Sequence, residues 1–158
     1  TTRKCPMSFH KQTWPQRLNQ MGDQAEGIYE TVYGETSERF GFNRPCFPIT
    51  RLPHLLRCAP DYIEDGKRFV EVQGFSTALK VKVEKIAALH HWAQYLPVDL
   101  FFYSSTKDDW CEIRLPDFMK LTATVATLGS YADGDKPYFR FTPSVLTGWA
   151  SEVAEVAP

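Results

Sequence analysis

The chain has 158 residues, a length that buries one hydrophobic core comfortably but not two. Hydrophobic residues make up 43% and charged residues 23%, which is ordinary for a globular domain. The formal net charge of −1 argues against a protein that holds nucleic acid by bulk positive charge alone, although an enzyme that brings a divalent cation to the phosphate is still allowed. We therefore expect one domain over residues 1–158.

Two negative features bear on location. The sequence has neither the long apolar run of a membrane helix nor the basic-then-apolar pattern of a signal peptide. The cysteines are far apart and form no CxxC pair, which disfavours both a zinc site and a disulfide framework. They are Cys5, Cys46, Cys58 and Cys111. We expect buried free thiols in a cytoplasmic protein without a membrane partner.

The first predicted element is a helical region over residues 8–33, in which Pro15 suits a first turn and Gly34 a stop. Residues 41–48 are rich in Gly and Pro and are predicted to form a loop. The residues at helical spacing, expected to be buried, are Leu18, Met21, Ala25, Ile28, Tyr29 and Val32.

A hairpin follows, with strand-like runs at residues 54–63 and 67–75 separated by Glu64-Asp65-Gly66. Residues 80–96 are then predicted to form a helix that ends at Pro97, because apolar residues recur there at helical spacing.

The remaining elements complete a mixed pattern. They are a buried strand at 98–103, a strand at 110–115, a strand or helix at 119–128, a turn at 133–135, a strand at 138–142, and a short helix or tail that includes Trp149. This order predicts an α/β or α+β domain with a mixed β-sheet flanked by helices.

The loop length of the hairpin decides whether Asp61 and Glu71 lie on the same face. A two-residue Asp65-Gly66 turn would direct them to opposite faces. A three-residue loop instead pairs Asp61 with Phe69, brings Asp61, Glu71 and Gln73 to one face, and puts Gly66 in the left-handed position. The two carboxylates are then diagonal neighbours, about 7 Å apart at Cβ. The other face is apolar, with Leu56, Cys58, Tyr62, Val70 and Val72.

Two converging carboxylates suit a metal-dependent phosphodiesterase. Such an enzyme needs at least two hard oxygen ligands around a cation that binds the phosphate and lowers the pKa of a water. We therefore predict that Asp61 and Glu71 hold Mg²⁺ or Mn²⁺.

The pattern Pro60-Asp61 … Glu71-x-Gln73 resembles the PD-(D/E)xK nuclease superfamily. The resemblance implies a restriction-endonuclease-like core over about two-thirds of the chain. It also implies that Glu26 on the first helix adds a further acidic ligand, with Glu30 as a geometric competitor, and that the main-chain carbonyl of Val72 contributes a ligand.

The sequence departs from this pattern at Gln73, where most members carry Lys. A neutral amide cannot remove a proton from water, so the resemblance implies that Gln73 only orients it. Other branches supply the missing cation from the next helix, for which Lys85 is our first choice and Lys82 the second. We further predict phosphate contacts by Lys80, Lys82, Arg17 and Lys11.

These expectations lead to a metal-dependent DNA endonuclease, of the phage type or of the restriction or resolvase type. Its partners would be duplex or branched DNA and a second copy in a homodimer, with RNA left open. One alternative is a non-catalytic nucleic-acid-binding protein with a degenerate site. Another is a structural or interaction domain whose aromatic residues pack an interface. Asp61, Glu71 and Glu26 could also be solvated surface charges.

Other candidate motifs are assigned no chemistry. His90-His91 are adjacent on a helix and point in different directions, so packing beside Trp92 is expected. Ser104-Ser105 lacks the glycine context of an activated nucleophile, and no phosphate-binding glycine motif is present in the sequence.

Overall fold

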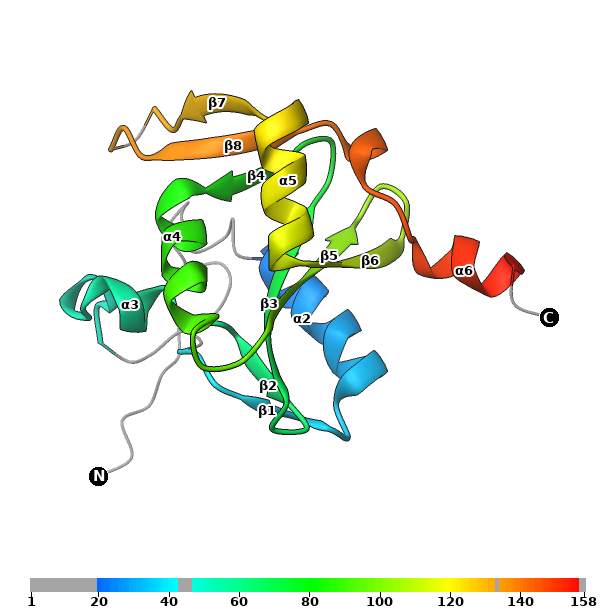
Figure 1. Ribbon diagram of the computed structural model, residues 1–158, viewed down its shortest axis with the longest axis horizontal. Coiled ribbons are helices and arrows are strands. Elements are labelled where there is room, and N and C mark those ends of the chain that lie inside the picture. The colour runs from blue at the N-terminus through cyan, green and yellow to red at the C-terminus, as the bar shows by residue number, and fades with distance from the viewer. Residues whose placement is uncertain (1–19, 43–46, 133, 157–158) are drawn as a thin grey trace.

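The protein has a mixed α/β architecture in a computed structural model that describes residues 20–42, 47–132 and 134–156 (Figure 1). The strands form two sheets, and the fold class predicted from the sequence is confirmed. The larger sheet has the order β1 (Ser37–Arg39), β2 (Tyr62–Glu64), β3 (Arg68–Phe75), β5 (Val98–Ser104), β6 (Asp109–Arg114). The smaller sheet has the order β4 (Leu79–Lys82), β8 (Pro137–Phe141), β7 (Thr127–Ser130).

Helices cover both faces of the larger sheet (Figure 1). On one face, α2 (Gln20–Tyr33) packs against the side chains of β3 and β5 that point toward it. On the other face, α4 (Val83–Trp92) and α5 (Leu115–Val125) enclose a larger apolar cluster, which the smaller sheet also joins. Short helices α3 (His54–Arg57) and α6 (Ala150–Val156) and 3₁₀ turns at 49–51 and 143–145 lie outside these layers.

The centre of the larger sheet is the parallel pair β3 and β5, in which Glu71 lies across from Leu100. Both strands are buried on two faces, which is why β5 is a continuous apolar run in the sequence. The crossover between them passes through β4 and α4 and brings the start of α4 over β3. The described part of the chain contains no helix that is long and apolar enough to cross a membrane.

The predicted first helix is present over its described part, as α2, and ends at Gly34, whose amide donates to the carbonyl of Glu30 at 2.8 Å. The helix contacts the sheet through Ala25 and Tyr29, which are fully buried. Met21 and Val32, nearer the two ends, were expected in the core but are 38% and 41% exposed. Residues 8–19, with Leu18, Arg17 and Lys11, lie outside the described residues.

The strand predicted at 54–63 is wrong over its first part. Pro53 begins a helical turn there, the amide of Cys58 donates to His54 at 2.9 Å, and only Tyr62–Glu64 is strand. The hairpin register also differs, because Tyr62 pairs with Val70 and Glu64 with Arg68. Asp65 and Gly66 both have positive φ, 53° and 64°. Continued by one residue, this register sets Asp61 opposite Glu71, so the predicted pairing with Phe69 is wrong.

The helix predicted at 80–96 begins later and ends earlier. Leu79–Lys82 is strand β4, with Leu79 and Val81 buried and Lys80 and Lys82 exposed, and the helix proper is Val83–Trp92. An alternating apolar–charged pattern is typical of a half-buried strand, so the tertiary pairing of β4 with β8 overrides the helical spacing that follows.

In the carboxyl-terminal third, the structure shows which part of residues 119–128 is helix and which is strand. The segment predicted at 119–128 is helix α5 as far as Val125, followed by strand β7. Gly134 and Asp135 form a turn with positive φ, whereas residue 133 of the predicted turn lies outside the described residues. Trp149 is only 2% exposed and belongs to the main core rather than to a free tail.

Candidate functional site

Three segments of the chain bring Asp61, Glu71 and Lys85 together. Asp61 directly precedes β2, Glu71 lies in the middle of β3, and Lys85 is in the first turn of α4. The Lys85 ammonium lies 2.9 Å from Glu71 Oε1 and donates to the carbonyl of Ala59 at 3.3 Å. Asp61 Oδ2 accepts the backbone amide of Val72 at 2.8 Å, which fixes this carboxylate beside Glu71.

Burial dominates the electrostatics of Glu71. Its side chain is 9% exposed, and burial, followed by the charge of Asp61, raises the pKa of Glu71 to about 8 despite the opposing charge of Lys85. Burial alone would lower the pKa of Lys85, but the charges of Glu71 and Asp61 outweigh it and raise that pKa above its ordinary value. One ammonium therefore faces two carboxyl groups.

One oxygen of this cluster is not satisfied. Glu71 Oε1 contacts Lys85, whereas among the described residues no donor reaches the buried Oε2, and the neighbouring carboxyl group is that of Asp61. Two buried carboxyl groups side by side are satisfied either by a shared proton, in agreement with the raised pKa of Glu71, or by a cation that takes its place.

Glu26 and Asp61 share a second cation, Arg39 of β1. The Arg39 guanidinium binds both oxygens of Glu26, at 2.8 and 3.3 Å, and approaches Asp61 Oδ1 at 3.8 Å. Burial raises the pKa of Glu26, which the hydrogen bond from Arg39 opposes. Glu30, the geometric competitor, instead accepts the hydroxyl of Tyr62 at 2.6 Å.

Arg39 is the residue of the site that the sequence reasoning missed. It lies on a strand of three residues, Ser37–Arg39, which has no apolar alternation and stood in no predicted element. The available signal was its basic side chain after the acidic residues Glu35 and Glu38.

The predicted metal ligands fit a cation only in part. Asp61 and Glu71 lie side by side with one oxygen uncommitted, and the main chain of Val72 runs beside them. Glu26 is occupied by Arg39. Among residues 20–42, 47–132 and 134–156, no group of three or more His, Cys, Asp or Glu side chains is arranged to hold a metal ion. The described residues therefore offer a cation two carboxylates, those of Asp61 and Glu71.

Gln73 has a partner on strand β4. Its side-chain amide donates to the carbonyl of Lys80 at 2.6 Å, so it links β3 to β4. Lys85, rather than Lys82, is the cation beside Glu71. Lys80 and Lys82 extend from β4 toward the rings of Tyr131 and Tyr138.

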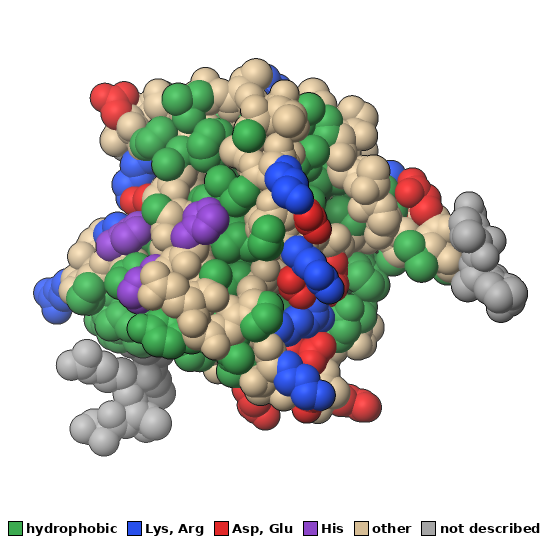
Figure 2. All heavy atoms as spheres, in the orientation of Figure 1, with side chains coloured by type: hydrophobic (Ala, Val, Ile, Leu, Met, Phe, Trp, Pro, Cys, Tyr) green, Lys and Arg blue, Asp and Glu red, His purple; other side chains and the backbone are tan. Residues whose placement is uncertain are grey.

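The motifs that were assigned no chemistry have structural partners. His91 packs edge-on against Trp92 and Tyr95, with ring centroids 5.9 and 5.8 Å apart, and histidine and hydrophobic side chains gather over α3 and α4 (Figure 2). Ser104 Oγ accepts the amide of Lys107 at 3.2 Å, and the Ser105 hydroxyl donates to the carbonyl of Phe75.

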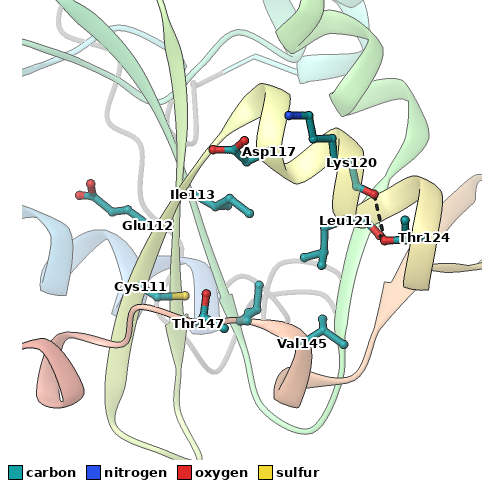
Figure 3. Close-up of a pocket in the computed structure, with 10 residues that line it drawn as sticks. Cys111, Glu112, Ile113, Asp117, Lys120, Leu121, Thr124, Val145 and Thr147 are labelled. Atoms are coloured by element: carbon teal, nitrogen blue, oxygen red, sulfur yellow. Dashed lines mark hydrogen bonds between the residues drawn. The ribbon is translucent and has the colours of Figure 1, made fainter.

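A hollow of about 320 Å³ lies apart from these carboxylates, between β6, α5 and the 3₁₀ turn at 143–145. Figure 3 shows Leu121 and Val145 in its lining, with Asp117 and Lys120 on α5. None of Asp61, Glu71 and Lys85 lines it, and its lining is mainly apolar. The hollow and the carboxylates therefore lie in different places. The carboxylates are the candidate site, because buried groups with shifted pKa values are typical of functional sites.

Comparison with protein-family models finds no match, and comparisons with curated proteins and with solved structures find none either.

Proposed function

We propose that the protein is a metal-dependent nuclease that hydrolyses phosphodiester bonds of DNA at Asp61 and Glu71. The observation that carries this proposal is the buried pair of carboxyl groups beside the ammonium of Lys85, one of which has an oxygen that no donor reaches within the described part of the chain. The arrangement also agrees with the resemblance to the PD-(D/E)xK superfamily and with its restriction-endonuclease-like core, which we propose for this chain.

The roles of the residues follow from their contacts. Asp61 and Glu71 would hold Mg²⁺ or Mn²⁺ together with the carbonyl of Val72, and that cation would neutralise phosphate charge and acidify a water. Lys85 would hold Glu71 in place and supply the positive charge that Gln73 lacks. Arg39 would position Asp61. It would also hold Glu26 near the metal without making it a direct ligand.

A second candidate is a nucleic-acid-binding protein that has kept the fold and lost the chemistry. The ion pair between Glu26 and Arg39 favours it, because that pair removes the third predicted ligand. The absence of a three-ligand group among the described residues favours it as well.

The test is cleavage of supercoiled, linear, branched and single-stranded DNA with Mg²⁺, Mn²⁺ or EDTA. We expect metal-dependent cutting by the wild type and a loss of at least about 100-fold in Asp61→Asn and Glu71→Gln, because each removes a charged ligand. Asp99→Asn is the matched control, since Asp99 is a partly buried carboxylate on the neighbouring strand that pairs with Arg68.

Two results would contradict the proposal. One is that no substrate is cut with either metal, and the other is that Asp61→Asn cuts as fast as Asp99→Asn. Circular dichroism of each variant separates lost chemistry from lost structure.

A further inference from the structure

The smaller sheet presents a basic and aromatic face to solvent. On β4, the exposed Lys80 and Lys82 alternate with the buried Leu79 and Val81. Lys80 lies across from Arg140 and Lys82 across from Tyr138. Cross-strand partners in an antiparallel pair share a face, so these four side chains project outward together.

Two tyrosine rings lie together on this face. The centroids of Tyr131 and Tyr138 are 4.6 Å apart. The Lys80 ammonium is 5.1 Å from the Tyr138 ring and 5.9 Å from the Tyr131 ring, and that of Lys82 is 5.9 Å from the Tyr131 ring. We call this set, with Arg140, the tyrosine–lysine face.

Gly129 of β7 makes room for the ring of Tyr138. It pairs with Tyr138, and a Cβ atom at Gly129 would lie 2.8 Å from the ring and hydroxyl atoms of that tyrosine. The Tyr138 ring therefore lies across the backbone of β7, and the Tyr131 ring is inclined to it by 55°.

The other face of the smaller sheet packs into the main core. Leu79, Val81 and Phe141 are buried in the main core, and the Phe141 ring lies tilted against that of Phe118 with centroids 5.1 Å apart. The nearby acid Glu84 is engaged by Lys136 at 3.3 Å and by Arg57 at 3.6 Å. Lys80, Lys82 and Arg140 thus give the outward face a positive character.

We infer that the tyrosine–lysine face binds a single-stranded segment of DNA. A tyrosine ring stacks on the face of an unpaired base, and lysine and arginine side chains contact the phosphates between bases. Bases within a duplex are already stacked on each other and offer no such face. Two adjacent rings beside three basic side chains suit consecutive nucleotides of one strand.

The inference deepens and rests on the proposed function, because it names the kind of substrate. The face adjoins the carboxylate site: Gln73, two residues after Glu71, donates to the carbonyl of Lys80. Lys82 directly precedes α4, which carries Lys85 to Glu71. In Figure 1 the β7–β8 hairpin extends past α4. A DNA strand bound along this hairpin would therefore lead toward the start of α4.

The experiment is fluorescence anisotropy with a labelled oligodeoxythymidylate of about 15 nucleotides, in EDTA so that binding is separated from metal-dependent cleavage. We expect Tyr131→Ala and Tyr138→Ala each to weaken binding by about 5-fold or more, because stacking contributes substantially per base. Tyr138→Phe keeps the ring and should bind like the wild type. Tyr95→Ala is the matched control, because Tyr95 is 64% exposed and lies at the end of α4.

Charge and shape are tested separately. Lys80→Ala and Lys82→Ala should each reduce the slope of log affinity against log salt by about 0.7, whereas Lys67→Ala on the hairpin turn should leave it unchanged. Gly129→Ala should weaken binding although every ring and charge is retained, because the new methyl group displaces Tyr138.

Several outcomes would overturn the inference. They are tyrosine variants that bind like the wild type, a duplex that competes as well as the single strand, and tighter binding of an oligouridylate than of the oligodeoxythymidylate. Binding through the tyrosine–lysine face without cleavage of any DNA would contradict the proposed nuclease activity but support the inference. If the tyrosine variants still cleave DNA and bind it like the wild type, the nuclease activity stands and the inference is wrong.

Discussion

At the scale of single residues, the candidate site depends on the carboxyl group of Glu71. It is enclosed by the sheet and α4, contacts one ammonium through Oε1, and lies beside the carboxyl group of Asp61, and no donor among the described residues reaches its Oε2. By contrast, Arg68 engages Asp99, Glu112 and Glu64 at 2.7, 3.1 and 3.2 Å and ties four strands together. The Arg68 cluster is suited to structure, whereas the Glu71 cluster has capacity left for a ligand.

The raised pKa of Glu71 predicts a pH-dependent stability in the absence of metal. The folded state holds the proton to about pH 8, whereas the ordinary value is 4.5, so the folded state binds more protons between these values. The contribution is fully present below the lower value and is lost as the pH rises through the upper one. Measured by urea unfolding in EDTA, wild type should lose stability relative to Glu71→Gln from about pH 5 to pH 8, by at most about 1.4 kcal/mol per pH unit.

The comparison with Glu71→Gln cancels the titration of groups that both proteins share. Parallel stability curves for the two proteins would show that Glu71 is ionised throughout this range.

At the scale of elements, the packing of α2 on β3 depends on a close backbone approach. A Cβ atom at Gly74 would clash with the carbonyl oxygen of Met21 and would lie 3.3 Å from the Cβ of Ala25. The helix therefore reaches the sheet at a point where only glycine fits. This contact holds the helix that carries Glu26 against the strand that carries Glu71.

Gly74→Ala should accordingly destabilise the protein by about 1–3 kcal/mol, because the added methyl group pushes α2 away from the sheet. Gly27→Ala on the same helix is the matched control: nothing lies within 4 Å of a Cβ there, and alanine should stabilise the helix by about 0.5–1 kcal/mol. Urea unfolding monitored by circular dichroism measures both changes. Equal stabilisation by the two substitutions would contradict the close approach.

At the scale of the whole molecule, the candidate site joins segments that are distant in sequence. Arg39, Asp61, Glu71 and Lys85 come from β1, the start of β2, β3 and α4. A cation held by Asp61 and Glu71 would therefore connect separate strands and should bind the folded state in preference to the unfolded chain.

Mn²⁺ should thus raise the melting temperature. At 100 times its Kd, a ligand of the folded state stabilises by about 2.7 kcal/mol. Thermal unfolding of the wild type should shift upward with millimolar Mn²⁺, that of Asp99→Asn should shift equally, and that of Asp61→Asn should not shift. An unchanged wild-type melting temperature would favour the non-catalytic binding protein instead.

Local patterns in the sequence predicted much of the fold. The helix ending at Gly34, the strand 67–75 and the continuous apolar run of β5 are recognisable because spacing and turn residues act over short distances. The boundaries at 54–57 and 79–82 were wrong, since Pro53 and the pairing of β4 with β8 decided them. The partners of Glu26 and Gln73 were equally hidden, because each contact joins residues from different elements, whereas Lys85 beside Glu71 had been the first choice among the helix lysines.

The sequence by itself determined the mixed α/β class and the placing of Asp61 and Glu71 on the two arms of one hairpin, because both follow from residue periodicity and from turn residues; the pairing of Asp61 with Phe69 predicted from the loop was wrong. Only the tertiary structure decided that Arg39 takes up Glu26, that Gln73 braces β4, and that Lys85 reaches Glu71. Those choices depend on how a crossover helix and an edge strand dock on the sheet, and docking is governed by burial and charge between residues that no local pattern connects.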